Sequence, residues 1–276
     1  MRPQDTRVPH RLFPLALLLG AALAQTATPP VTRTGDVTLT RTRVAFPGVP
    51  AQDHVTATAA FVRSPATPAG AGVRDVCSVQ DFGSAGLPGA GSGTGPASPP
   101  PASLDAGTPL VLRSGSGTYT ALHRRTEGKR VTYAPPTPLL PAPPISLVLD
   151  IPGAKDGFPA FRNVEVPSLA LPVLTAPAPA DGLTVDTVFQ WTGATRDAHA
   201  TVMLAGVSDD ADVMFSCFAQ DDGSFALPAQ TRAELRARGF ESGSLTMVGR
   251  TALRTVRSGD AVLNVRTFTQ ELRGGQ

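Results

Sequence analysis

The chain of 276 residues carries 24 Lys and Arg against 22 Asp and Glu, a formal net charge of +2. Gly (27) and Pro (28) make about a fifth of the sequence, above the usual share but below that of a wholly disordered chain. With 41% hydrophobic residues and no long internal apolar stretch, the composition excludes collagen, coiled-coil, polytopic membrane and strongly basic nucleic-acid-binding proteins.

The first 24 residues have the order of a secretory signal peptide. Three arginines (Arg2, Arg7 and Arg11) precede an apolar run at 12–23, and Ala22-Leu23-Ala24 matches the pattern before a cleavage site. We expect a signal peptide at 1–24 and a secreted or periplasmic chain without a transmembrane segment after cleavage. A short buried helix is the alternative, but no amphipathic pattern follows it. Cleavage removes these three arginines and Asp5 and leaves 21 basic and 21 acidic residues, so we expect no nucleic-acid binding.

After a leader at 25–35, alternating apolar and β-branched residues predict an N-terminal β-sandwich unit at 36–171. The strands expected there are 37–46, 54–62, 109–113, 119–123, 130–133, 145–151 and 162–171. Ser114-Gly115-Ser116-Gly117 has the glycines of a tight hairpin turn. Residues 83–103 are small, polar and rich in Gly and Pro, so they predict a flexible loop.

A Pro-rich segment at 172–181 predicts a linker to a C-terminal β-sandwich unit at 182–270. The strands expected in this unit are 183–191, 200–207, 213–219, 244–250 and 261–268. A helix is expected at 229–238, because Pro228 precedes it and Gly239 suits its C-terminal end. Many short strands with one helix predict an all-β fold of two Ig-like β-sandwich units, with the helix in the second.

The two cysteines begin two similar segments. Residues 77–88 and 217–228 agree at seven of twelve positions, and this likeness fits either two related sandwich units or chance in a biased composition. An even number of cysteines in an exported chain favours a disulfide between Cys77 and Cys217. The alternative is two buried thiols, one in each unit, that never meet.

We predict no catalytic, cofactor-binding or metal-binding residue. The sequence lacks a Gly-x-Ser-x-Gly elbow, a phosphate-binding glycine loop and clustered Cys and His, and after cleavage each histidine stands alone (His54, His123 and His199). A group of aspartates could offer oxygens to Ca²⁺, but Asp is also a common turn residue, which is the interpretation we favour (Asp209, Asp210, Asp212, Asp221 and Asp222).

Two other features have both a binding and a structural interpretation. Trp191 is the single tryptophan and could join a sugar-binding platform, but its place in an alternating strand favours the core. The basic run His123-Arg124-Arg125, with Lys129-Arg130, could meet an anionic polymer, but a solvated hairpin end is the more common role.

Five short pieces occur in a fixed order over roughly 36–270. They are Cys77 before the Gly/Pro-rich loop, Leu104–Pro109 opening a strand, Pro152–Phe158, Gly182–Val185 leading to Trp191-Thr192-Gly193, and Phe215-Ser216-Cys217 followed by Leu227-Pro228. In this order the chain resembles a family of uncharacterised secreted bacterial proteins with β-sandwich folds, from which it departs by an insertion at 186–190. The resemblance implies export and fold, and it brings no activity, cofactor or functional residue.

These features predict an exported structural or interaction module of the cell envelope or exterior, whose partner is unknown and could be an envelope protein or a polysaccharide. A polysaccharide-binding module is the first alternative, and an exposed row of Trp or Tyr would favour it. A hydrolase with a loop-built site is the second. It needs a Ser or Asp within hydrogen-bond reach of a histidine in a cleft.

Overall fold

The computed structural model describes residues 32–63, 76–81 and 101–274, apart from 116, 145, 169, 179–180, 195–200 and 210–211. Within these ranges the protein is all-β with one short helix, so the predicted fold class is confirmed. The expected signal peptide and most of the expected loop at 83–103 lie outside the described residues. No helix in the described part of the chain is long and apolar enough to cross a membrane.

Nine strands precede residue 170: β1 (Arg33–Ala45), β2 (Gln52–Arg63), β3 (Val76–Asp81), β4 (Ala102–Ser103), β5 (Leu110–Ser114), β6 (Gly117–Glu127), β7 (Arg130–Ala134), β8 (Leu147–Ile151) and β9 (Phe161–Val166). Seven strands and the helix follow: β10 (Val173–Ala176), β11 (Val188–Thr192), β12 (Thr201–Ser208), β13 (Val213–Gln220), β14 (Ser224–Ala226), α1 (Ala229–Ala237), β15 (Gly243–Ser258) and β16 (Ala261–Gly274).

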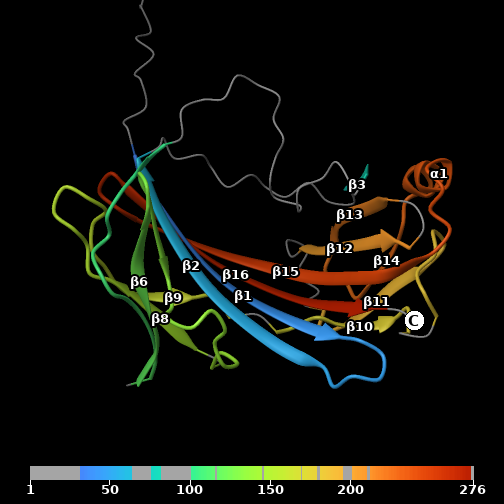
Figure 1. The fold of residues 1–276 in the computed structure, drawn as a ribbon, viewed down its shortest axis with the longest axis horizontal. Helices are drawn as coiled ribbons and strands as arrows, with labels where there is room; N and C mark the ends of the chain where they lie inside the picture. Colours follow the sequence, from blue (N-terminus) through green and yellow to red (C-terminus); the bar gives the residue numbers. More distant parts are fainter. Residues whose placement is uncertain are drawn as a thin grey trace, which may run out of the picture.

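Four long strands form the middle of the molecule. β15, β16, β1 and β2 lie side by side and extend from one end of the ribbon to the other (Figure 1). β1 pairs with β2 and β15 with β16 as antiparallel neighbours, whereas β1 and β16 are parallel from Arg33↔Ala261 to Ala45↔Arg273. The N-terminal and C-terminal hairpins are therefore fused into one surface.

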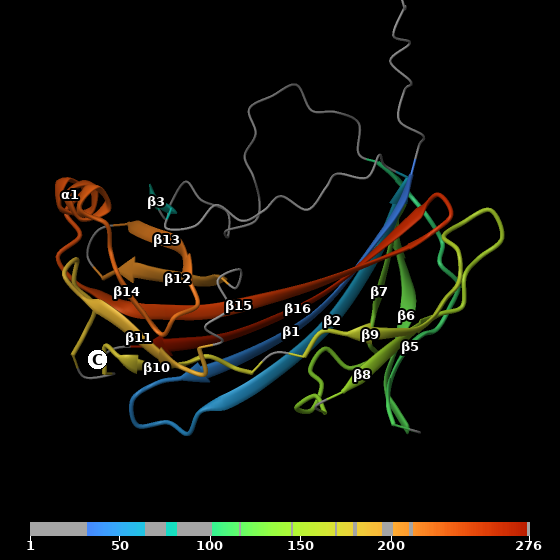
Figure 2. The ribbon, with the colours of Figure 1, turned by 180° about the vertical axis from the view of Figure 1, so that it is seen from behind.

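These four strands belong to a large sheet with the order β3-β13-β12-β15-β16-β1-β2-β7-β6-β5-β8-β9, with β4 beside β2. A second sheet has the order β10-β11-β14. Seen from behind, β5 to β9 turn away from the long strands at one end, and β10, β11 and β14 lie at the other (Figure 2). The expected strands are thus present, but their pairing is set by contacts between distant segments.

A first hydrophobic core lies at the β5–β9 end. It is built mainly from residues 37–166 and contains Phe61, whose ring centroid is 5.4 Å from that of Tyr133 and 4.6 Å from that of Phe158. Apolar residues at alternate positions of β2 and β8 point into this core, which is why these segments form strands. The first part of β16 contributes three residues of one strand face to the same core: Ala261, Leu263 and Val265.

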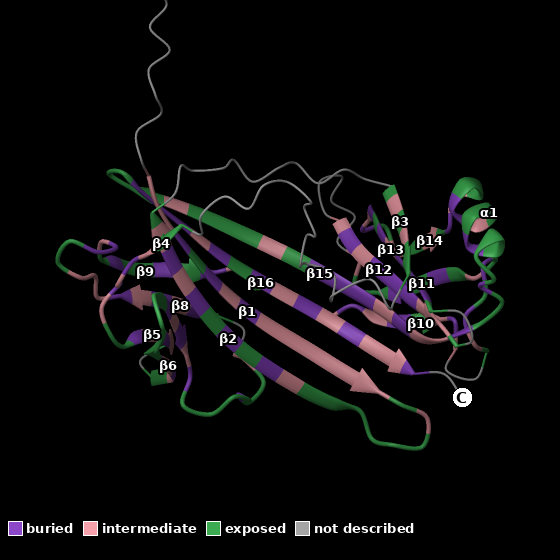
Figure 3. Cartoon of the chain, turned by 45° about the horizontal axis from the view of Figure 1, so that its top comes forward, coloured by how far each residue is buried: buried purple, intermediate pink, exposed green. Residues whose placement is uncertain are grey.

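A second core lies between the three-stranded sheet and the β13-β12-β15 part of the large sheet. It draws on residues 174–248 and includes Phe189 and Phe215, whose ring centroids are 6.0 Å apart. β15 contacts both cores, because Val248 is buried in the second and Val256 packs against the first. Figure 3 shows buried and more exposed positions alternating along these long strands.

The segment 172–181, expected as a linker, contains the strand β10. The reason is that this part of the segment pairs with β11 in the three-stranded sheet, and polar side chains of β16 also bind it, as described below. Division into two independent Ig-like units stays a prediction. In the structure one continuous sheet carries both cores, and β16 from the C-terminal part contributes to the first core.

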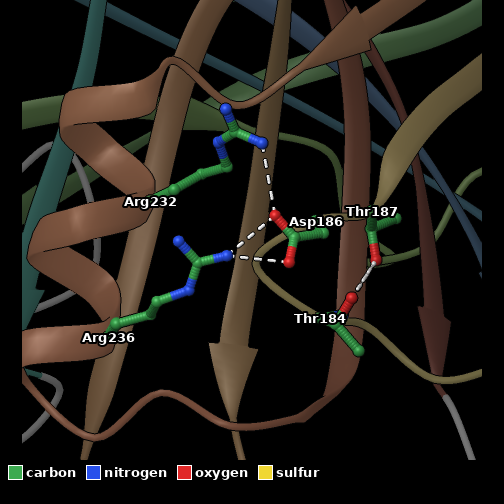
Figure 4. A network of polar contacts seen from close by, with 5 residues as sticks. All are labelled: Thr184, Asp186, Thr187, Arg232 and Arg236. Carbon is green, nitrogen blue, oxygen red and sulfur yellow. Dashed lines mark hydrogen bonds and ion pairs between the residues drawn. The ribbon is translucent and has the colours of Figure 1, made fainter.

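The single helix begins and ends nearly where the sequence predicts. α1 follows Pro228 and ends before Gly239, whose φ of 78° is readily adopted by glycine. Arg232 and Arg236 of the helix both donate to the Asp186 carboxylate, at 3.2 Å and 2.7–2.8 Å (Figure 4). The hydrogen bond from Arg236 is the main cause that lowers the pKa of Asp186. Asp186, part of the expected insertion, therefore fastens the helix to the chain that precedes β11.

Cys77 and Cys217 form a disulfide, so the predicted bridge is confirmed and the alternative of two separate thiols is wrong. They are directly opposite each other in the antiparallel pair of β3 and β13, with Cα atoms 4.0 Å apart. Arg63 of β2 pairs with Ala102 of β4. β3 is an edge strand of the large sheet, whereas β2 lies in its interior, so the disulfide holds an edge strand to its neighbour β13.

We predict that thiol titration of the denatured, unreduced protein finds no free thiol and that reduction lowers the melting temperature. The bond closes a loop over a sequence separation of 140 residues. In the chain-entropy model such a loop stabilises the fold by up to about 5 kcal/mol. A double variant, Cys77→Ser with Cys217→Ser, serves as the control, because its melting temperature should not respond to reductant. Two thiols per chain, or an equal response of both proteins, would contradict the assignment.

Candidate functional site

One face of β16 changes from apolar to polar halfway along the strand. After Val265, this face carries Thr267, Thr269, Glu271 and Arg273, of which the first three are buried. Such a buried polar series needs hydrogen-bond partners. They come from the strap, which we define as residues 167–177 apart from 169, the segment that leads from β9 through β10.

The first two positions of the series bind carbonyl groups near the start of the strap. The Thr267 hydroxyl donates to the Pro167 carbonyl at 2.6 Å, and the Thr269 hydroxyl lies 3.4 Å from the Ala170 carbonyl. The strap backbone is therefore satisfied by side chains at a place where no strand of the sheet pairs with it.

The next two positions bind the strap at β10. The Glu271 carboxylate accepts from the Leu174 backbone N–H at 2.6 Å. Arg273 donates to the carbonyls of Leu174 at 2.6 Å and Pro177 at 3.3 Å, and it also lies 3.3 Å from Glu271. Successive residues on one face of β16 thus bind successive residues of the strap in the same order.

A buried ion pair supports the strap from β15. Arg250 and Asp221 are 2% and 0% exposed, with Arg250 Nε 2.6 Å from Asp221 Oδ2 and Nη2 2.9 Å from Oδ1. Trp191 Nε1 donates to the same carboxylate at 2.8 Å, and Arg250 Nη1 donates to the Ala170 carbonyl at 3.2 Å. The prediction that Trp191 belongs to the core is confirmed. Asp221, for which we favoured a turn role over Ca²⁺ binding, lies in the bend after β13 and is also the buried partner of a cation.

The pairing register of the long strands brings Arg41 of β1 next to the polar series of β16. Arg250 on β15 pairs with Thr269 on β16, Thr269 pairs with Arg41 on β1, and Arg41 pairs with Val55 on β2. These four residues form one row across the long strands. Arg41 is the outermost polar member of the row, on the side toward the first core.

A cavity of about 300 Å³ opens where this row meets the strap. That volume is at the lower end of the range for small-molecule sites. Its walls come from β1, β8, β9, β16, the start of the strap and the segment before β8, and most of the lining side chains are apolar: Leu39, Arg41, Pro143, Pro144, Leu147, Val166, Pro167, Ser168, Ala170, Thr267 and Thr269. We call this the saddle cavity.

Arg41 is the charged residue among those that line the saddle cavity. Its Nη2 lies 2.6 Å from Asp53 Oδ2, and its side chain is 27% exposed. The Nε atom is buried and has no hydrogen-bond partner among the described residues. Because Nε is buried, a ligand in the cavity meets this side chain through its other guanidinium nitrogens.

A separate polar cluster sits in the first core and includes Asp105 and Ala106 of Leu104–Pro109, one of the pieces on which the family resemblance rests. Tyr133 donates to Asp105 at 2.7 Å and accepts from the Ala106 backbone N–H at 2.8 Å, while Arg124 lies 3.0 Å from Asp105. The Tyr133 hydrogen bond lowers the pKa of Asp105, and burial raises the pKa of Tyr133 to about 12. Because Tyr133 is fully buried and its hydroxyl is used by the backbone, this cluster has a structural role.

Glycines allow this piece and a second one, Pro152–Phe158, to approach closely. The Phe158 backbone N–H donates to the Asp105 carbonyl at 2.7 Å, and Gly153 N–H to the Ala106 carbonyl at 2.9 Å. A Cβ on Gly157 would lie 2.1 Å from the Asp105 carbonyl oxygen. Any side chain at 157 therefore forces the backbone apart.

The other residues singled out in the sequence do not gather into a site. His54 and His123 are on β2 and β6, and their side chains make no hydrogen bond to another described residue, whereas His199 lies outside the described residues. Asp209 accepts from Ser242 at 3.3 Å and Asp222 from the Ser224 backbone at 3.1 Å, whereas 210 is not described. No group of three potential metal-binding side chains is found in the described part of the chain.

The basic run on the β6–β7 hairpin is exposed, as the sequence predicts. Arg124 pairs with Asp105, and Arg125 donates to the Pro135 carbonyl at 2.9 Å. The absence of nucleic-acid binding stays a prediction. Sequence reasoning missed Arg41, Thr267 and Thr269, because polar residues in an alternating strand are ordinarily assigned to the solvent face.

Comparison with known proteins adds no relative: no protein-family model, no curated protein and no solved structure matches the chain. The family resemblance noted in the sequence therefore stays a prediction, and the functional argument depends on the geometry of the saddle cavity and the strap.

We predict that Asp221→Asn lowers the free energy of unfolding by about 3–5 kcal/mol, because it leaves the Arg250 charge buried without its counter-ion. Glu165→Gln is the matched control. It removes the exposed Glu165–Arg254 pair, with Nη1 2.6 Å from Oε2, and should cost less than about 1 kcal/mol. Urea unfolding of the two variants measures both values. Equal effects would contradict the assigned importance of the buried pair.

Proposed function

We propose that this chain is an exported interaction module of the cell envelope or exterior, and that its ligand-binding site is the saddle cavity. The observation that carries the proposal is a concave, mainly apolar space whose walls come from the middle of the sheet and from the strap. Sites on sheet scaffolds hold their geometry better than sites on free loops. A preformed cavity of this kind is the usual form of a small-molecule site.

The disulfide supports the exported location. Disulfides form and persist in oxidising compartments such as the periplasm and the exterior. The Cys77–Cys217 bond is consistent with the charged and apolar order of residues 2–24, which predicts a cleaved signal peptide. Both features favour a secreted or periplasmic chain.

The polysaccharide alternative has less support from the aromatic residues. Trp191 and Tyr133 are buried, and Tyr119 donates from its hydroxyl to the Pro141 carbonyl at 2.6 Å. These are all the Trp and Tyr residues of the chain, and they do not form an exposed row. The hydrolase alternative has no support from His54 or His123, neither of which lines the saddle cavity.

A cavity-filling variant tests the proposal. Ser168 is exposed, lines the saddle cavity and makes no hydrogen bond to the polar series on β16, so Ser168→Phe should fill the space without loosening the strap. The matched control is Ser258→Phe, an exposed position beside the β15–β16 turn.

Both variants and the wild type are incubated with small molecules extracted from the envelope of the producing cells and examined by native mass spectrometry. We expect the wild type and Ser258→Phe to retain a small molecule that Ser168→Phe does not. A melting temperature equal to that of the wild type shows that each variant is folded. Retention of nothing by the wild type, or of the same molecules by all three proteins, would contradict the proposal.

A further inference from the structure

We propose that the saddle cavity takes an amphiphilic carboxylate, a molecule with an unbranched apolar body and one anionic carboxylate group, and that Arg41 binds the carboxylate. This inference rests on the proposed function, because it names the ligand class of the same site. It arises from the contrast between the mainly apolar walls and Arg41, the one cation among the residues that line the cavity.

Most of the residues that line the saddle cavity are apolar. Leu39, Leu147 and Val166 approach the cavity from three different strands, β1, β8 and β9, and prolines line the rest of the apolar wall. Prolines and aliphatic side chains bind hydrocarbon by excluding water, with a gain of about 25 cal/mol per Å² of apolar surface. Sugars and other ligands with many hydroxyls would lose hydrogen bonds against such walls.

Arg41 is the residue of the saddle cavity that would bind the carboxylate. Its Nη2 atom lies 2.6 Å from Asp53 Oδ2, and its Nε atom is buried, so a ligand in the cavity reaches the guanidinium through the Nη groups. Guanidinium groups bind carboxylates through several N–H donors at once. A ligand carboxylate would accept from the Nη donors that Asp53 does not use.

The two threonines of the cavity do not compete for this role. The Thr267 hydroxyl already donates to the Pro167 carbonyl at 2.6 Å, and Thr269 is directed to the Ala170 carbonyl. With their hydrogens used by the strap, these hydroxyls offer lone pairs rather than donors. Arg41 is therefore the strongest donor to an anion among the residues that line the cavity.

The test measures binding of three probes with the same ten-carbon chain to the exported protein: decanoate, decan-1-ol and decylamine, each below its micelle concentration. Isothermal titration calorimetry should show the wild type binding decanoate about tenfold or more tightly than decan-1-ol, as expected for a charge-assisted hydrogen bond. Decylamine should bind more weakly than decan-1-ol, because Arg41 repels its ammonium group.

Substitutions on β1 and β2 assign the effect to Arg41. Arg41→Gln should lower decanoate affinity about tenfold and leave decan-1-ol binding within about twofold. Arg43→Gln is the matched control, since it lies two residues further along the same strand and does not line the cavity. Asp53→Asn removes the competing carboxylate and should make decanoate bind more tightly.

Equal affinity of the wild type for decanoate and decan-1-ol would overturn the inference, as would unchanged decanoate affinity in Arg41→Gln. If Arg41→Gln does not fold, the three probes on the wild type and on Asp53→Asn still decide. If decanoate does not bind while Ser168→Phe still abolishes retention of an envelope molecule, the ligand class is wrong and the proposed function stands. If decanoate binds equally to Ser168→Phe, the cavity is not the site and both fail.

Discussion

The strap and the saddle cavity both depend on the polar series of β16, whose side chains bind the strap. From Thr267 to Arg273, alternate residues bind backbone groups between Pro167 and Pro177. Before β10 the strap crosses the large sheet without pairing to a strand, and a backbone N–H or C=O group that is buried without a partner costs free energy. These side chains supply the partners, so the strap can cross between the two cores without becoming a solvent-exposed linker.

The polar series of β16 also explains why the saddle cavity lies beside the strap. The first half of the β16 face is apolar and packs into the first core, and the second half binds the strap through polar groups. Hydrogen bonds fix the strap at side-chain distance from the sheet, whereas close apolar packing would fill the space. The saddle cavity lies at this change of character, where Leu39 and Arg41 follow each other on one face of β1. The cavity has both apolar and polar lining residues because it lies where the first core ends.

Much of the local structure could be predicted from the sequence. Alternation identified most of the strands, and Pro228 and Gly239 placed the helix within one residue at its C-terminal end. The disulfide followed from an even number of cysteines in a chain with an export signal, and the equivalent positions of Cys77 and Cys217 are now explained by direct pairing of β3 with β13. Other features arise from pairing between distant segments. The parallel contact of β1 with β16 joins residues more than 200 positions apart, and β10 of the strap is a strand because it pairs with the distant strand β11. Asp221 and Arg250, 29 positions apart, carry no local sign that they are buried together.

Calorimetric unfolding tests most directly whether β16 and the strap couple the two cores. If they do, loss of one core removes strands that the other needs, and the protein unfolds in a single transition whose calorimetric and van't Hoff enthalpies agree. Two resolved transitions, or a van't Hoff enthalpy well below the calorimetric one, would mean that the cores unfold separately and would contradict this account.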